Sequence, residues 1–308
     1  MKQGLFIGGY GMLAKTLNKL KADDEIYWDI PYNFRFKSAQ DFADKVSGYD
    51  IVVNAAGKVG GIKYNIQNKT LLEDNLAIAI NGYQGAYVAD TPYIYIGSSC
   101  AYSPDVPQPF SESSIMEGGF EPTNLGYGLA KRAGIGLCLN APSHFSCLAL
   151  VSCNLYGEFD NYDSTYGHLI GSMITKMKTL RDMGQKAYTI WGNGEQRREF
   201  MNATYLCNAI NYFAKLMLEE NSCIGKVERV INIGPEVDYS VLEYAKAIAS
   251  GLNWEPQWIF DTNQPIGMQS KCMSSSLART LGWWATDFGD ATILEDVAQV
   301  AATFDRGY

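Results

Sequence analysis

The sequence predicts an α/β protein, built on a doubly wound parallel sheet with a smaller, discontinuous second lobe. Short apolar runs alternate with helix-like segments through the first half of the chain, and a glycine-rich turn follows the first run. Beyond Asn154 this regular pattern loosens. Continuous apolar strands separated by helices are typical of parallel sheets that are covered on both faces.

Each expected strand is a short apolar run. The strands of the sheet are expected at residues 4–7, 25–28, 50–56, 92–97, 146–151 and 230–233. The second lobe is expected to contain an amphipathic helix at 169–183, a short strand at 187–191 and a helix at 242–252.

Composition describes an ordinary globular protein, because 308 residues with 47% hydrophobic and 19% charged content can bury a large core. The net charge of −8 argues against a nucleic-acid partner, since phosphate contacts need basic surface. No apolar run reaches the ~18 residues of a membrane span, and the first residues do not read as a signal peptide. Seven cysteines without a CxxC pair indicate free thiols. We therefore expect a cytoplasmic protein without a metal site.

The glycine-rich turn predicts a Rossmann-type dinucleotide site. Gly8, Gly9 and Gly11 follow the first strand, and Met12 and Leu13 open a helix. Glycines allow a tight turn and close approach to a pyrophosphate, which then meets the partial positive charge of the helix N-terminus. We accordingly expect a dinucleotide-binding domain over residues 1–160, completed by parts of 192–235. A substrate-binding lobe is expected over 161–191 and 236–308.

Asp29 ends the second strand, at about the distance where an acid binds the adenosine ribose hydroxyls. Such an acid would repel a 2′-phosphate and favour NAD over NADP. A loop aspartate without this role fits the sequence equally well, and Arg35 could act as a compensating cation.

Tyr127 and Lys131 are four residues apart, a spacing that places both side chains on one face of a helix. A nearby ammonium favours the phenolate and should lower the tyrosine pKa from ~10. The phenol could then exchange a proton with a carbonyl oxygen, as ketone reduction requires. The spacing alone is also compatible with a half-buried tyrosine beside a solvated lysine.

With these residues in view, the chain resembles the GDP-L-fucose synthase family of extended short-chain dehydrogenase/reductases over nearly its whole length. The matching motifs lie at residues 56–62, 97–100, 121–127, 131–135, 154–157, 160–161, 191–194 and 198–200. The resemblance implies an NAD(P)H-dependent homodimer. It would epimerise a GDP-4-keto-6-deoxymannose-type sugar at C3 and C5 and reduce it at C4.

The resemblance also implies a role for each catalytic residue. Ser98 would hydrogen-bond the C4 oxygen, Tyr127 would donate the proton as hydride arrives, and Lys131 would tune the phenol and contact the nicotinamide ribose. Cys100 and His168 would exchange protons at C3 and C5, which the C4 ketone acidifies.

Two sets of ligand-binding residues are expected from the glycine turn, from the end of the second strand and from the resemblance. The residues expected at the cofactor are Gly8, Gly11, Met12, Leu13, Asp29, Ala55, Ala56, Tyr127, Lys131, Asn154 and His168. Those expected at the nucleotide sugar are Lys58, Asn154, Lys176, Trp191, Arg198 and Lys271. Arginine and lysine neutralise phosphate, and an indole offers a flat face. A solvated helix face is an equally open interpretation of Lys176.

The chain departs from the family pattern around the expected cofactor phosphate. Gly9 and Tyr10 stand where the family usually carries histidine and arginine, and Asp29 and Pro31 replace arginines after the second strand. The resemblance implies NADP(H), whereas the local chemistry favours NAD(H), so both stay open.

The segment 265–276 also diverges from the family and bears on the shape of the substrate. A C4-reductase or epimerase of a different GDP-4-keto sugar, such as a 6-deoxyheptose, therefore stays an alternative, as does the loss of one epimerisation step. A catalytically silent dinucleotide-binding sensor is the alternative of another class.

Overall fold

The computed structural model describes residues 1–20, 25–32, 36–285 and 292–307. Arg35 lies outside these ranges. Among the described residues, the main sheet has six strands in the order β2-β1-β3-β4-β5-β9, and all of its pairings are parallel. The predicted fold class is confirmed. The strands are β1 (Lys2–Ile7), β2 (Ile26–Asp29), β3 (Ile51–Asn54), β4 (Tyr93–Ser98), β5 (Cys147–Ser152) and β9 (Val230–Ile233).

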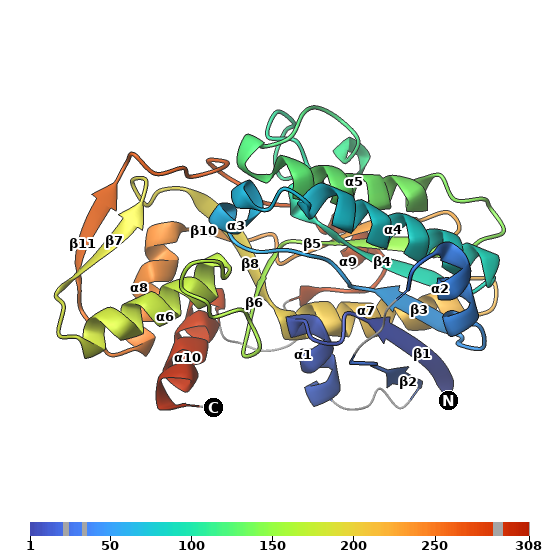
Figure 1. The fold of residues 1–308 in the computed structure, drawn as a ribbon, viewed down its shortest axis with the longest axis horizontal. Coiled ribbons are helices and arrows are strands. Elements are labelled where there is room, and N and C mark those ends of the chain that lie inside the picture. Colours follow the sequence, from blue (N-terminus) through green and yellow to red (C-terminus); the bar gives the residue numbers. More distant parts are fainter. Residues whose placement is uncertain (21–24, 33–35, 286–291, 308) are drawn as a thin grey trace.

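Helices cover both faces of this sheet, which explains why every residue of β3 and β5 is buried. One layer is formed by α2, α4 and α5, and α1 packs with α7 in the other (Figure 1). These helices are α1 (Met12–Leu20), α2 (Ala39–Val46), α4 (Leu71–Val88), α5 (Leu125–Leu139) and α7 (Ala203–Leu218). Asn202 caps α7 by accepting a hydrogen bond from Thr204 N. The sequence pattern had not predicted α7.

A second core cluster, separate from that of the main sheet, lies at the left of Figure 1. Two small sheets of order β10-β8-β6 and β11-β7 accompany it. The strands are β6 (Asn154–Tyr156), β7 (Ala187–Trp191), β8 (Arg197–Asn202), β10 (Asp238–Ser240) and β11 (Gln257–Asp261). The helices are α6 (Leu169–Asp182), α8 (Val241–Gly251) and α10 (Ile293–Arg306). The domain boundaries expected from the sequence stay a prediction.

Capping boxes fix the starts of two of these helices. The Ser240 and Glu243 side chains each bond the other's backbone N–H at the start of α8, and Thr292 and Glu295 do the same for α10. The remaining short helices are α3 (Ile62–Gln67), α9 (Ser276–Thr280), η1 (Ser99–Ala101), η2 (Glu112–Ser114) and η3 (Pro122–Asn124).

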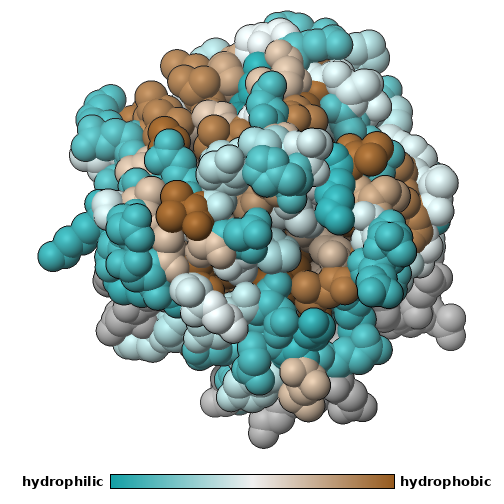
Figure 2. All heavy atoms as spheres, turned by 90° about the vertical axis from the view of Figure 1, so that its right-hand side faces the viewer, coloured by the Kyte–Doolittle hydropathy of each residue, from teal (hydrophilic) through white to brown (hydrophobic). Residues whose placement is uncertain are grey.

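The face turned toward the right of Figure 1 carries apolar side chains interspersed with polar ones (Figure 2). Within the described ranges, no helix combines the length and hydropathy needed to cross a bilayer. All seven cysteines are free thiols, as expected from their spacing. No group of metal-ligating side chains is found in the part of the chain that the structure describes.

Candidate active site

A cavity of about 950 Å³ runs from the glycine turn into the second lobe. It collects residues that are far apart in the sequence, from the ends of the sheet strands, α5, α6, β8 and the segment 265–271. Most of the residues expected at the site line it: Gly8, Gly11, Met12, Leu13, Ala55, Ser98, Cys100, Tyr127, Lys131, Asn154, His168, Lys176, Trp191, Arg198 and Lys271.

The glycine turn forms a cradle at the carboxyl ends of β1 and β3. Gly8 has φ +133°, and a Cβ there would lie 3.3 Å from the carbonyl group of Ala55. Gly11 N donates to Gly8 O at 2.8 Å, which closes the turn immediately before α1 begins at Met12. Bare backbone at a strand-to-helix turn suits the pyrophosphate of a dinucleotide. The residues present therefore fit such a cofactor.

The side of this turn next to β2 is closed. A Cβ on Gly9 would overlap the carbonyl oxygen of Pro31, so position 9 has no room for the basic side chain common in the family. Asp29 lies outside the cavity lining and accepts a hydrogen bond from Tyr49 Oη at 2.5 Å. The hydrogen bond to this carboxylate, with burial, raises the pKa of Tyr49 to about 12.

Tyr127 and Lys131 lie on α5, whose first turns face the end of β4. Lys131 Nζ donates to Ile96 O at 2.8 Å and lies 5.8 Å from the centroid of the Tyr127 ring. Burial lowers the pKa of Lys131 to about 8. Burial and the nearby Cys100 raise the pKa of Tyr127 well above its usual value, although the Ser98 hydroxyl opposes this.

The direction of the Tyr127 pKa shift differs from the sequence expectation. Removing the phenol from water penalises the phenolate, the charge of Cys100 penalises it further, and the hydrogen bond with Ser98 only partly offsets these two effects. At neutral pH the phenol is therefore protonated, which is the form that a proton donor needs.

Cys100 is the middle residue of the short 3₁₀ turn η1 at the end of β4, where Cys100 N donates to the Oγ of Ser98 at 3.3 Å. Lys271 Nζ lies 3.3 Å from its Sγ. Burial raises the pKa of the thiol, but the charge of Lys271 and hydrogen bonds from Ser98, Lys271 and Asn124 outweigh it, so the net pKa is lowered. Cys100 therefore ionises to the thiolate more readily than an ordinary cysteine does.

His168 precedes α6, and its Nδ1 lies 3.0 Å from Asp160 Oδ1. Burial lowers the pKa of His168, whereas the hydrogen bond and charge of Asp160 raise it and prevail. The environments of Cys100 and His168 therefore favour a base and an acid, respectively, which is the division that a pair of proton-exchanging groups requires.

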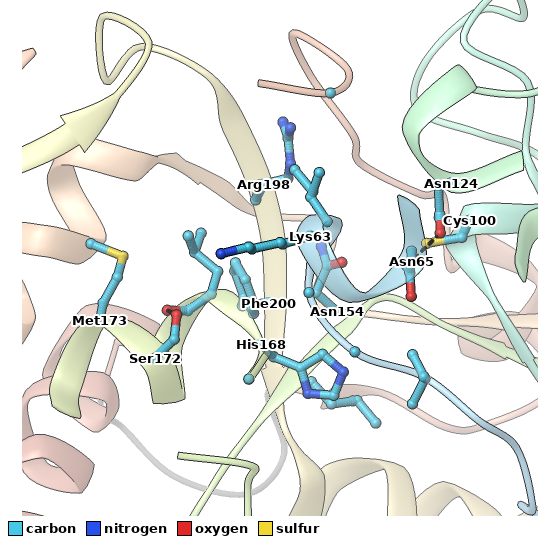
Figure 3. A pocket seen from close by; sticks show the side chains of 18 of the residues that line it. Lys63, Asn65, Cys100, Asn124, Asn154, His168, Ser172, Met173, Arg198 and Phe200 are labelled. Atoms are coloured by element: carbon cyan, nitrogen blue, oxygen red, sulfur yellow. Dashed lines mark hydrogen bonds between the residues drawn. The ribbon is translucent and has the colours of Figure 1, made fainter. Parts of the chain in front are cut away.

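Cations and an indole surround the far end of the cavity. Arg198 on β8 donates to Ile266 O at 2.8 Å, Lys176 on α6 is half-buried, and Trp191 on β7 is 42% exposed. Burial lowers the pKa of Lys176, with a further contribution from Lys63. Lys63 projects from α3 across the cavity toward α6 (Figure 3). The positive charges of Arg198, Lys176 and Lys63 could neutralise the negative charges of a bound diphosphate.

Three of the expected binding residues do not line the cavity. Besides Asp29, these are Ala56 and Lys58. The ammonium of Lys58 donates to the Asp74 carboxylate on α4 at 2.7 Å. The backbone N of Lys58 donates to Asn75 Oδ1 at 2.9 Å, and Asn75 Nδ2 donates to Lys58 O at 2.9 Å. The structure therefore places the Lys58 backbone near the site and its side chain away from it.

Sequence reasoning had missed Lys63 and Asn124 as site residues. Figure 3 shows Cys100, Asn124 and Asn65 together on one side of the cavity, with Lys63 and Arg198 on the other. Asn65 Nδ2 donates to Asn124 Oδ1 at 2.7 Å. The position of Asn124 just before Tyr127 was a usable signal, whereas nothing in a lone lysine near a glycine pair indicates which way it points.

Comparison with known proteins places the chain in a family. The NAD dependent epimerase/dehydratase family matches residues 20–234, a range that begins after the glycine turn. A GDP-L-fucose synthase from Azorhizobium caulinodans is 34% identical over 290 residues, covering 92% of this chain and 91% of that protein. A GDP-L-colitose synthase from Yersinia pseudotuberculosis is 35% identical over 239 residues, covering 76% and 75%.

Solved structures share the fold at lower identity. A GDP-6-OMe-4-keto-L-xylo-heptose reductase from C. jejuni has a TM-score of 0.81 at 20% identity, covering 96% of both chains. An NADP-bound GDP-L-fucose synthetase from Naegleria fowleri has a TM-score of 0.79 at 20% identity, covering 97% of this chain and 91% of that one. The silent sensor considered from the sequence is therefore set aside. The chain is an enzyme of the NAD dependent epimerase/dehydratase family, and GDP-L-fucose synthases are among its relatives.

Proposed function

We propose that this enzyme epimerises a GDP-4-keto-6-deoxymannose-type sugar at C3 and C5 and then reduces C4, giving GDP-L-fucose or a close relative. The observation that carries the proposal is the presence of two sets of groups in one cavity. Ser98, Tyr127 and Lys131 line it together with Cys100 and His168. A reductase without epimerisation has no need of the last two.

The epimerising half works on hydrogens that the C4 ketone acidifies. The Cys100 thiolate removes a proton from the carbon next to the ketone, and the electron pair moves onto the C4 oxygen. His168, held by Asp160, returns a proton to the opposite face of the same carbon. Performed at C3 and at C5, the exchange inverts both centres and consumes no reductant.

The reducing half converts the C4 ketone to an alcohol. The bound nicotinamide supplies the hydride that C4 accepts. Tyr127 holds the proton that the C4 oxygen takes up, and Ser98 donates a hydrogen bond to that oxygen. Lys131, anchored on Ile96 O at 2.8 Å, keeps a positive charge near the phenol and stabilises the phenolate that remains.

For the cofactor we propose NAD(H) as the preferred form, although resemblance favours NADP(H). A 2′-phosphate would need basic partners beside the glycine turn. Pro31 fills the space at Gly9, and the carboxylate of Asp29 lies at the end of β2. The first feature leaves no room for a basic side chain at position 9, and the second repels a further negative charge.

A cytoplasmic homodimer completes the proposal. The free thiols fit a reducing compartment. The dimer is supported by large apolar side chains that α4 and α5 expose: Ile80, Tyr87, Val88, Leu125, Leu129 and Leu139. Light scattering coupled to size exclusion measures the mass in solution directly, and a monomer would contradict this part.

The function is tested by incubating the purified enzyme with GDP-4-keto-6-deoxymannose and either NADPH or NADH, followed by NMR of the product. We expect GDP-L-fucose, with solvent deuterium at C3 and C5 when the reaction runs in D₂O. If neither cofactor supports turnover, the proposed function is wrong.

The second candidate is epimerisation and reduction of a different GDP-4-keto sugar. It is favoured by the Yersinia relative that is named for GDP-L-colitose. The same NMR assay with a panel of GDP-4-keto sugars, including a 6-deoxyheptose, distinguishes the two candidates by relative kcat/KM.

A further inference from the structure

Lys271 and Cys100 are 171 positions apart in the sequence, yet their Nζ and Sγ atoms lie 3.3 Å apart. Only 7% of Lys271 is exposed, and the thiol is partly buried at the end of β4. A long cationic side chain is almost never buried to this extent unless a partner compensates for the lost water. The thiol is the partner that the geometry offers.

The backbone around Lys271 is fixed by β8. Glu199 N donates to Lys271 O at 3.1 Å, and Arg197 N donates to Gln269 O at 2.8 Å. Two residues on, Met273 N donates to Glu199 Oε2 at 2.9 Å. Because these bonds hold the chain on both sides of Lys271, the ammonium is aimed at the thiol by the fold and not by a flexible loop.

Glu199 is also an electrostatic neighbour of Lys271, but burial raises the pKa of its carboxyl group to about 8, and its hydrogen bonds go elsewhere. Its Oε1 accepts from Glu236 N at 2.8 Å and its Oε2 from Met273 N at 2.9 Å. Among the described residues, the ion pairs include none between a carboxylate and Lys271. Cys100 is therefore the group in direct contact that can carry the balancing negative charge.

Other charged groups also face Cys100. His168 just before α6, Arg198 on β8 and Lys131 on α5 each interact electrostatically with the thiol. Tyr127 is the neighbouring group that would be anionic if ionised. The cations all favour the thiolate, but Lys271 is the one that also donates a hydrogen bond to it. The net pKa of Cys100 is lowered.

The geometry points to Lys271 as the positioning residue that holds Cys100 as a thiolate, and so makes it the base of the epimerising half. This role rests on the proposed function and differs from the diphosphate contact that the family resemblance implies. In the step concerned, the thiolate takes a proton from the carbon beside the C4 ketone, the C–H electron pair moves to the C4 oxygen, and the thiol formed stays next to the ammonium.

The test needs no sugar, so its failure is distinguishable from failure of the proposed function. Alkylation of Cys100 by iodoacetamide is followed by peptide mass spectrometry across pH, because the thiolate is the reactive form. Lys271→Met should raise the midpoint of the pH profile and slow labelling at pH 7 by about fivefold or more. Lys271→Arg should restore most of the rate. An unchanged midpoint in Lys271→Met would overturn the inference.

Two controls separate charge from structure. Lys176→Met removes a cavity cation that does not touch the thiol and should leave the Cys100 midpoint unchanged, whereas an equal shift would overturn the direct-contact role. The exposed Cys223 gives the reference rate in each sample, and labelling of the buried Cys147 reports unfolding. If Lys271→Met unfolds, Lys271→Gln gives the same comparison with a polar side chain in place.

Discussion

Asp160 Oδ1 accepts a hydrogen bond from Asn161 N at 2.7 Å and lies 3.0 Å from Nδ1 of His168. The carboxylate is buried, and its other oxygen has no hydrogen-bond partner within the described structure. A buried carboxylate on one ring nitrogen orients the imidazole and directs the other nitrogen into the cavity. The pair therefore favours the protonated form of the imidazole that faces the cavity.

Asp160→Asn should lower the pKa of His168 below the ordinary histidine value. The burial that opposes protonation would remain, while the charge and hydrogen-bond acceptor that outweigh it would be gone. Because the chain has 2 histidines, an NMR titration of the imidazole signals resolves both. The exposed His144 serves as the internal reference, and an unshifted His168 curve would contradict the electrostatic role of Asp160.

Cys100→Ser should impair solvent deuterium incorporation at C3 and C5 more than Tyr127→Phe does, because the thiolate acts before reduction. Tyr127→Phe should lower kcat for reduction by about 10²-fold or more while exchange continues. Both rates are measured by NMR in D₂O with GDP-4-keto-6-deoxymannose. Equal loss of exchange in the two variants would count against this division of labour.

Gly128→Ala should destabilise the protein and displace Cys100. A Cβ at this position of α5 would lie 2.5 Å from the Cys100 carbonyl oxygen and 3.3 Å from the Phe120 ring. Overpacking of this kind costs about 1–3 kcal/mol of the free energy of unfolding. Urea denaturation measures it.

Gly136→Ala on the same helix is the matched control. Its Cβ would lie 3.4 Å from the flexible end of Met116, so the helix propensity of alanine should stabilise the protein by up to ~1 kcal/mol. Equal effects of the two substitutions would show that contact with the Cys100 turn does not matter.

Asp29→Asn should weaken discrimination against NADPH, because it removes a negative charge from the end of β2. We expect the ratio of kcat/KM for NADH over NADPH to fall by about 5- to 10-fold, or roughly 1 kcal/mol. Tyr49→Phe removes the hydrogen-bond donor and keeps the carboxylate, so it should preserve the ratio. A wild-type preference for NADPH would refute the cofactor assignment.

Asp305→Asn should cost about 1 kcal/mol of stability at pH 7, because Asp305 accepts hydrogen bonds from Arg181 and Lys178 and so ties α10 to α6. Arg181 holds the pKa of Asp305 well below its usual value. The stabilisation is therefore fully present above the unfolded pKa of ~3.9 and is lost as pH falls through the lower folded pKa.

The difference in urea stability between wild type and Asp305→Asn should accordingly shrink as pH is lowered below ~4. Asp44→Asn is the control, since this exposed carboxylate accepts from the neutral Gln40 amide. A difference that stays constant with pH would exclude the ion-pair explanation.

The strands of the sheet and the reactive side chains could be predicted from the residue pattern alone. Continuous apolar runs such as Ile51–Asn54 can only be buried between two helical layers, and each run expected in the sheet became one of its strands. The spacing of Tyr127 and Lys131 placed both on α5 because helical periodicity is local. Amphipathic α6 and α8 were found for the same reason.

How these groups behave depends on contacts that the folded chain makes between distant segments. Helix α7 is different, because its buried residues recur at helical spacing behind the Asn202 cap, so a local pattern was present and was missed. The pKa of Tyr127 moved against expectation because burial depends on everything packed around the ring. Lys58 and Lys271 look alike in sequence, yet one pairs with Asp74 and the other meets a thiol 171 positions away. Contacts between distant segments arise only when the chain folds, and the burial and charge partners that set each pKa depend on those contacts.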